Sequence, residues 1–143
     1  MINDKLNTLL ANYAVVAHKT QNFHWYIKGH TFFNTHAKLE EFYDQMFDQI
    51  DEVAELVLQN GGQPIASMAG FLKAATIDEA EDGFKEVNTL FATVKEDFEA
   101  LRSLAADIKK DADAEDNYLV SAAMDEHIAM LSKHIWMIGQ SQM

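Results

Sequence analysis

The segment THAKLEEFYDQMFDQIDEVAEL, residues 35–56, decides the fold because it reads as one uninterrupted amphipathic helix. Its apolar residues recur at helical spacing, and it contains neither Pro nor Gly. His36 and Glu40 are four residues apart, so both point the same way from the helix. Asp51 and Glu55 repeat that spacing farther along. At 100° per residue the four side chains fall within an arc of about 100° and share one face.

Imidazole and carboxylate together are ligands for iron, zinc or manganese. His36 and Asp51, however, are separated by about 22 Å along the helix axis, at 1.5 Å per residue. One metal centre cannot span that distance, so a single kind of site needs two chains. An antiparallel copy of the helix, related by a two-fold axis near Gln45 and Met46, would bring each His36/Glu40 end to the Asp51/Glu55 end of its partner. The pattern thus predicts both a metal and a dimer.

The composition indicates one globular domain, residues 1–143, that is built from long helices. Apolar residues make up 48% and charged residues 24%, and only one Pro and six Gly are available for turns. The absence of Cys excludes disulfides, thiolate zinc sites and thiol catalysis, and fits a reducing compartment. No signal peptide and no apolar run long enough to cross a membrane is recognised. We therefore expect a cytoplasmic protein.

The net charge of −12 disfavours nucleic acid as a partner, because duplex binding requires clustered Lys and Arg. The eleven basic residues are scattered, and neither end carries a basic tail. An acidic surface attracts cations instead. The charge alone is equally well explained by ordinary solubility.

Helical periodicity predicts four long helices and one short helix, with no strands. The short helix follows the second long one, and Ser67 is its expected cap. This order favours an all-α four-helix bundle with one crossover, the ferritin-like topology, although many bundles share the same helix count. The expected ranges are about 3–26, 32 or 33 to 60, 67–74, from after Thr76 to about Lys109, and 117–139, with a polar turn at 111–116.

A fifth candidate ligand, His24, lies near the end of the first predicted helix in the segment NFHWYIKGH. Each candidate taken alone is a common surface residue. Two His and three carboxylates on a consistent face favour a hard or borderline divalent ion, and iron best fits that donor set. The candidate ligands are then His24, His36, Glu40, Asp51 and Glu55.

The spacing of these residues resembles the signature of the Dps family, the mini-ferritins or DNA-protecting proteins of starved cells. The resemblance covers essentially the whole chain, and its His–Trp, His and Asp-x-x-x-Glu spacings are specific. It rests on His24–Trp25–Tyr26, Gly29–His30, Phe33, His36, Glu40, Asp51–Glu52–Val53–Ala54–Glu55, Gly61–Gly62 and Lys133–His134–Ile135–Trp136–Met137.

This resemblance implies a hollow homododecamer with an iron site at each dimer interface. It implies oxidation of Fe(II), preferably by hydrogen peroxide, and storage of the ferric product, which protects the cell from oxidative damage. The residues that match the family pattern divide into two half-sites. His24, His36 and Glu40 form one, and Asp51 and Glu55 of the partner chain form the other.

The chain departs from the family pattern in two respects. Glu40 stands where the family usually has Asp, which bears on metal spacing and affinity. The Lys-rich tail with which some members bind DNA is absent, and twelve copies would sum to about −144, so DNA binding is not expected. The alternative is a non-enzymatic Dps-type shell or a DNA-associated structural protein. A larger ferritin or bacterioferritin fits less well, because no Glu here has His three residues later.

Several other residues have two readings. Trp25 and Tyr26 beside His24 are candidates for quenching a stray oxidising equivalent, although packing is favoured for Tyr26. His18, His30, His127 and His134 are not expected to be metal ligands. His127 and His134 are expected to be surface or packing residues. An acidic cluster resembles the family's iron-entry pore in its place along the chain, but a solvated turn is favoured. Its members are Asp111, Asp113, Glu115, Asp116, Asp125 and Glu126.

Overall fold

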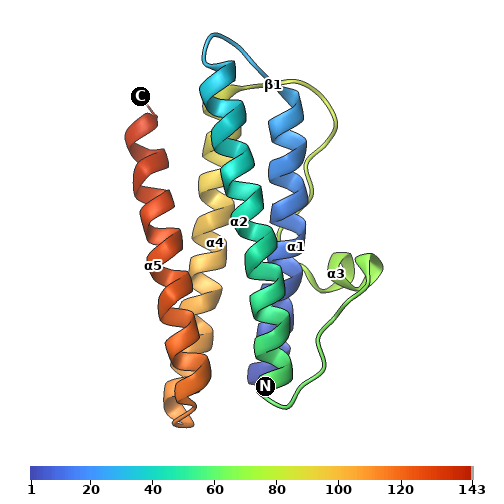
Figure 1. Ribbon diagram of the computed structural model, residues 1–143, viewed down its shortest axis with the longest axis vertical. Helices are drawn as coiled ribbons and strands as arrows, with labels where there is room; N and C mark the ends of the chain where they lie inside the picture. Colours follow the sequence, from blue (N-terminus) through green and yellow to red (C-terminus); the bar gives the residue numbers. More distant parts are fainter. Residues whose placement is uncertain (143) are drawn as a thin grey trace.

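Four long helices lie side by side in the computed structural model, which describes residues 1–142 (Figure 1). Helix α1 packs against α2 and α4, and α4 packs against α5. The short helix α3 projects from the connection between α2 and α4 and contacts α1. The expected all-α ferritin-like bundle is confirmed, including the extra helix in the crossover. The helices are α1 (Ile2–Tyr26), α2 (Phe32–Gln59), α3 (Met68–Ala74), α4 (Val87–Ala114) and α5 (Tyr118–Ser141).

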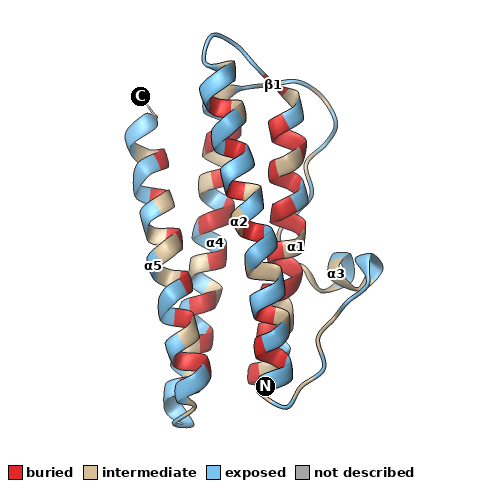
Figure 2. Cartoon of the chain, viewed as in Figure 1, coloured by how far each residue is buried: buried red, intermediate tan, exposed pale blue. Residues whose placement is uncertain are grey.

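Helix α1 is the most extensively buried of the long helices, with buried residues on most of its faces (Figure 2). The other long helices bury one stripe each and leave the opposite face to solvent. On α5 the buried stripe is Val120, Ser121, Met124, His127, Leu131, Ile135 and Ile138. His127 is therefore in phase with the core and not on the surface.

Residues in the left-handed conformation end two of the helices. Gly61 has φ +77° after α2, and the N–H of Gly62 donates to the carbonyl of Val57 at 2.8 Å. Asp116, with φ +55°, ends α4 in the same conformation, and the N–H of Asn117 donates to the carbonyl of Ala112 at 2.8 Å. The end expected at Lys109 was therefore wrong by about one turn, because the stop signal is an Asp and not a Gly.

The start expected for the third long helix, just after Thr76, was also wrong, since α4 begins at Val87. The buried amide of Asn12 explains the difference. Its Oδ1 accepts the backbone N–H of Thr76 at 2.8 Å and that of Ile77 at 3.3 Å. These bonds hold the chain extended along α1. Helix α4 begins only after Glu86, whose side chain is the N-cap and accepts the Asn88 N–H at 3.1 Å.

Two short strands that were not expected pair in parallel at one end of the bundle. In β1 (Ile27–Lys28) and β2 (Lys85–Glu86), Ile27 lies opposite Lys85 and Lys28 opposite Glu86. Each strand has only two residues, too few for a period-two sequence pattern. The pairing joins the end of α1 to the start of α4, so α2 and α4 run in the same direction (Figure 1).

A chain of side-chain amides joins three helices at the opposite end. Asn60 Nδ2 donates to Asn3 Oδ1 at 2.9 Å, and Asn117 Nδ2 donates to Asn60 Oδ1 at 2.8 Å. Asn3 Nδ2 donates to the backbone carbonyl of Asn60 at 3.3 Å. Gly62 is required here, because a Cβ at that position would lie 2.6 Å from Asn3 Nδ2.

None of the helices in residues 1–142 combines the length and the apolar character that crossing a bilayer would need.

Candidate metal centre

His24 at the end of α1 and His36 at the start of α2 bind each other's backbone. His24 Nδ1 lies 2.7 Å from the carbonyl oxygen of His36, and His36 Nδ1 lies 2.8 Å from the carbonyl oxygen of His24. The two rings stack with centroids 3.6 Å apart and planes 14° apart. The β1 turn between the helices brings these residues together although they are twelve positions apart in the chain.

The reciprocal bonds fix where the ring protons lie. A carbonyl oxygen only accepts, so Nδ1 of each neutral imidazole carries its proton and Nε2 of each keeps its lone pair. This is the arrangement by which second partners orient histidine ligands of metals. Both rings therefore present an Nε2 that can bind a cation.

Glu40 lies one helical turn beyond His36 and completes this group. Its Oε1 is 3.8 Å from His24 Nε2. His24 is only 5% exposed, while the Glu40 side chain is 55% exposed. Phe32 stacks on the His36 ring at 4.7 Å, and Tyr43 meets the His24 ring edge-on at 5.2 Å. Aromatic rings thus back both imidazoles, and the carboxylate beside His24 faces solvent.

Asp51 and Glu55 lie far along α2 from the histidines. Both are exposed, and together with Glu52 they line a surface hollow of about 380 Å³ between α2 and α5. Within residues 1–142, no three His, Cys, Asp or Glu side chains gather closely enough to hold a metal ion. In one chain, His24 therefore contacts both the His36 ring and the Glu40 carboxylate without forming a closed metal site, and Asp51 and Glu55 are a separate pair.

Comparisons with known proteins agree with this fold. A family model described as a ferritin-like domain matches residues 3–141. The DNA protection during starvation protein of Brevibacillus brevis is 38% identical over 133 residues, which are 93% of this chain and 89% of that protein. This chain belongs to the Dps family.

Solved Dps structures superpose on nearly the whole chain. The Dps protein from Bacillus brevis has a TM-score of 0.93 at 36% identity, covering 97% of this chain and 93% of that one. The Dps protein from Vibrio cholerae O1 has a TM-score of 0.94 at 35% identity, covering 97% and 87%. The latter is described as a member of a broad superfamily of ferritin-like diiron-carboxylate proteins.

In this Dps-family chain, the acidic cluster around the α4–α5 turn is partly neutralised by lysines. Lys109 Nζ lies 3.0 Å from Asp125 Oδ1 and 3.8 Å from Asp113 Oδ2. Lys5 Nζ lies 2.7 Å from Asp111 Oδ2. These ion pairs are exposed or half-buried and contribute little to stability. A role of the cluster in iron entry remains a prediction.

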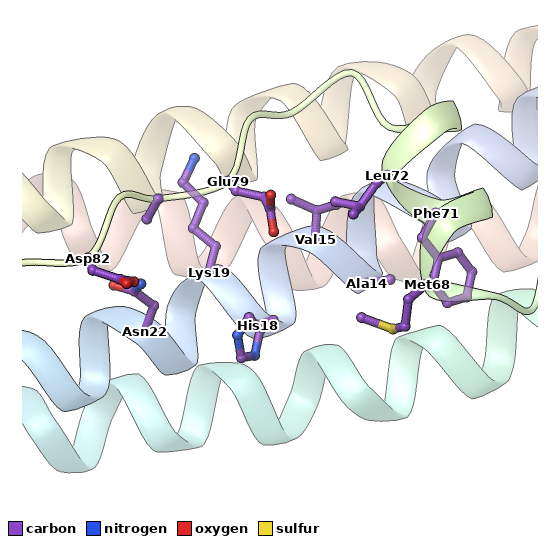
Figure 3. Close-up of a pocket in the computed structure, with 11 residues that line it drawn as sticks. Ala14, Val15, His18, Lys19, Asn22, Met68, Phe71, Leu72, Glu79 and Asp82 are labelled. Atoms are coloured by element: carbon purple, nitrogen blue, oxygen red, sulfur yellow. The ribbon is translucent and has the colours of Figure 1, made fainter.

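A smaller hollow of about 150 Å³ lies between α1, α3 and the segment that follows α3 (Figure 3). His18, Lys19 and Asn22 line it from α1, and Glu79 and Asp82 line it from the crossover. It contains none of the five expected ligands. Its Lys19 belongs instead to an ion pair with Asp97 of α4, in which Nζ is 3.0 Å from Oδ2.

Sequence reasoning missed a buried polar group at the centre of the Dps bundle. The hydroxyl of Tyr13 on α1 lies 2.7 Å from His127 Nδ1 on α5. His127 Nε2 lies 3.5 Å from Glu52 Oε1 on α2 and makes no hydrogen bond within the described residues. Burial lowers the pKa of His127 to about 4. The signal was its helical phase, since His127 follows Val120 and Met124 on the core stripe of α5.

Proposed function

We propose that this protein is a ferroxidase that sequesters iron, oxidises Fe(II) with hydrogen peroxide as preferred oxidant, and stores the ferric product inside a homododecamer. The proposal rests on one observation: the backbone contacts of Nδ1 leave Nε2 of both His24 and His36 free to bind a cation, and His24 Nε2 lies 3.8 Å from the Glu40 carboxylate. The Dps relatives and the diiron-carboxylate description of the Vibrio cholerae protein support iron as the substrate.

The active centre that we propose is shared between two chains. His24, His36 and Glu40 of one chain bind Fe(II) together with Asp51 and Glu55 of its partner. The separation of the two groups on α2 supports this, because one chain cannot close the site alone. Five such donors leave coordination positions open for an oxidant.

The exposed face of α2 supports the antiparallel dimer. Helical phase places Phe47 between the two ligand pairs, and Phe47 is 47% exposed. Leu58 on the same face is 59% exposed. The sequence placed the two-fold axis near Gln45 and Met46. Met46 is buried in its own chain, so the exposed Phe47 next to it is the side chain that we propose to lie at the axis.

The proposed reaction is the reduction of hydrogen peroxide by two electrons and two protons. Two Fe(II) ions each give one electron to one hydrogen peroxide, which takes up two protons and becomes two water molecules. Holding both ions at one site keeps the two transfers together. A single Fe(II) would instead reduce hydrogen peroxide by one electron and release a hydroxyl radical. The paired arrangement therefore protects the cell as well as oxidising iron.

The net charge of −12 suits a store of cations better than a DNA condenser. Twelve chains would carry about −144, which repels a phosphate backbone. We also propose a cytoplasmic location, since the proposed reaction consumes Fe(II) and hydrogen peroxide that are present inside the cell.

The test is anaerobic loading with Fe(II), followed by a limiting amount of hydrogen peroxide. The Fe(II) consumed per peroxide is measured, and a spin trap reports hydroxyl radical. Two Fe(II) per peroxide with little trapped radical would support the proposal. One Fe(II) per peroxide with abundant radical would refute it and favour a non-enzymatic shell.

A further inference from the structure

A tyrosine and a histidine form a hydrogen-bonded pair that the proposed iron chemistry does not use. Tyr13 Oη and His127 Nδ1 are 2.7 Å apart, and their rings are tilted with centroids 5.4 Å apart. Tyr13 is 0% and His127 is 1% exposed. In the described part of the chain, no other tyrosine hydroxyl is hydrogen-bonded to a histidine.

The surroundings decide which atom of the pair holds each proton. Burial, and then the charge of Glu52, raises the pKa of Tyr13, so the phenol keeps its proton. A neutral His127 has one ring proton, which either nitrogen can carry. The Glu52 carboxylate 3.5 Å from Nε2 favours that nitrogen as the protonated one. Nδ1 is then the acceptor, and the phenol donates to it.

We propose that Tyr13 is a redox-active tyrosine whose proton acceptor is His127. In the step, Tyr13 gives one electron to a one-electron oxidant, such as a peroxide-derived radical, and its O–H bond breaks. The proton moves to His127 Nδ1. The products are a neutral tyrosyl radical, an imidazolium ion and the oxidant reduced by one electron.

The geometry makes this loss of an electron feasible inside the core. Removing the electron alone would leave a cation on the buried phenol, and an isolated buried charge is strongly disfavoured. Moving the proton to His127 Nδ1, which lies 2.7 Å from the phenol oxygen, removes that charge from the ring and places it opposite Glu52. An oxidised phenol is a far stronger acid than imidazolium, so His127 accepts the proton in spite of its lowered pKa.

The pair also lies next to the second carboxylate group on α2. Glu52 contacts His127 and lines the same hollow as Asp51 and Glu55. Ala123, one turn before His127 on α5, lines it as well. A role in quenching oxidants that escape from that half-site rests on the proposed function. The redox activity of Tyr13 does not.

The experiment uses the metal-free protein, so its outcome is independent of ferroxidase activity. Azide radicals generated by pulse radiolysis supply the one-electron oxidant. Optical absorption and electron paramagnetic resonance of frozen samples report tyrosyl radical, and electron–nuclear double resonance after exchange into deuterated water reports the proton shared with His127. We expect a long-lived tyrosyl radical with an exchangeable proton coupling.

Three variants assign that radical. Tyr13→Phe should remove most of the long-lived signal, and His127→Phe should shorten its lifetime and abolish the exchangeable coupling. The matched control Tyr118→Phe removes an exposed tyrosine and should change neither. Should a core variant fail to fold, a hyperfine coupling of the native radical to an imidazole nitrogen still decides, since an exposed tyrosyl radical is hydrogen-bonded to water and shows no such coupling. A native radical without that coupling, or a signal that Tyr13→Phe leaves intact, would overturn the proposal.

Discussion

Lys19 of α1 and Asp97 of α4 form a two-pronged ion pair inside the bundle, with Nζ 3.1 Å from Oδ1 and 3.0 Å from Oδ2. Both side chains are at most 11% exposed. Removing one partner leaves an uncompensated buried charge, which typically costs about 3–5 kcal/mol. We expect Lys19→Met to lower the free energy of unfolding by that order. The double variant Lys19→Met/Asp97→Leu should recover most of it, as measured by chemical denaturation.

The same pair gives a pH dependence with a definite sign. Burial raises the pKa of Asp97 above its ordinary 3.8, and Lys19 opposes that rise. A carboxyl with a raised pKa in the folded chain is destabilising once ionised, so its effect grows as pH rises above 3.8. In Lys19→Met the opposing charge is gone. Its melting temperature should therefore fall more steeply with rising pH than that of the native protein, and parallel curves would contradict this.

His127 contributes the opposite sign over a neighbouring range. Burial lowers its pKa from 6.5 to about 4, so the folded chain disfavours the protonated ring. Its contribution is complete above pH 6.5 and is lost as pH falls toward 4, a total of roughly 3 kcal/mol. We expect His127→Phe to flatten this part of the melting temperature against pH. His18→Phe, at an exposed position of α1, is the control and should leave the curve unchanged.

Loss of one histidine from the proposed centre should abolish fast oxidation of Fe(II). His36→Ala removes an Nε2 donor and also the partner of the His24 carbonyl. We expect stopped-flow absorbance to show only slow oxidation, while circular dichroism shows an intact helical bundle. His30→Ala, at an exposed turn residue, should oxidise Fe(II) at the native rate. Native rates in His36→Ala would refute the proposed ligand set.

Mixing variants tests whether the centre is shared. Chains with His36→Ala and chains with Glu55→Ala are each inactive alone in this proposal. After denaturation and joint refolding in equal amounts, random pairing restores about a quarter of the sites, because each mixed dimer regains one intact centre. Joint refolding of His36→Ala with Glu40→Ala should restore none, since both changes fall in the same half-site. Equal recovery in both mixtures would contradict a shared centre.

DNA should not be retained at physiological salt. The net charge of −12 per chain opposes the neutralisation of phosphates that duplex binding requires. We expect no retardation of a DNA fragment in gel electrophoresis at about 0.15 M salt. Strong retardation under these conditions would instead support the DNA-associated shell.

The helices were predictable because their signals are local and periodic. Apolar spacing and Gly61 located α2 to within a residue or two, and Ser67 caps α3 as expected, accepting Gly70 N–H at 3.1 Å. The start of α4 was not predictable. It depends on Asn12, which binds the backbone of Thr76 and Ile77, 64 and 65 positions later in the chain. No local sequence pattern indicates such a bond.

The sequence predicted that His24, His36 and Glu40 lie near one another, and it did not predict how the two imidazole rings are oriented. Spacing on α2 placed Glu40 one turn after His36, and the structure brings His24 beside them. The two reciprocal carbonyl bonds that orient the rings depend on the backbone of the α1–α2 turn, which side-chain identity does not specify.

The amide chain at the end of the bundle bears on how the protein ages. Asn60 precedes Gly61, the dipeptide in which a backbone nitrogen most readily attacks the side-chain amide and converts Asn to Asp or isoaspartate. In the folded chain Gly61 N–H donates to Leu58 O at 3.0 Å, while the Asn60 amide is held between Asn3 and Asn117. Both reacting groups are engaged elsewhere. Folding therefore protects this position from deamidation, and chemical damage at Asn60 would record how long a chain has spent with that end of the bundle open.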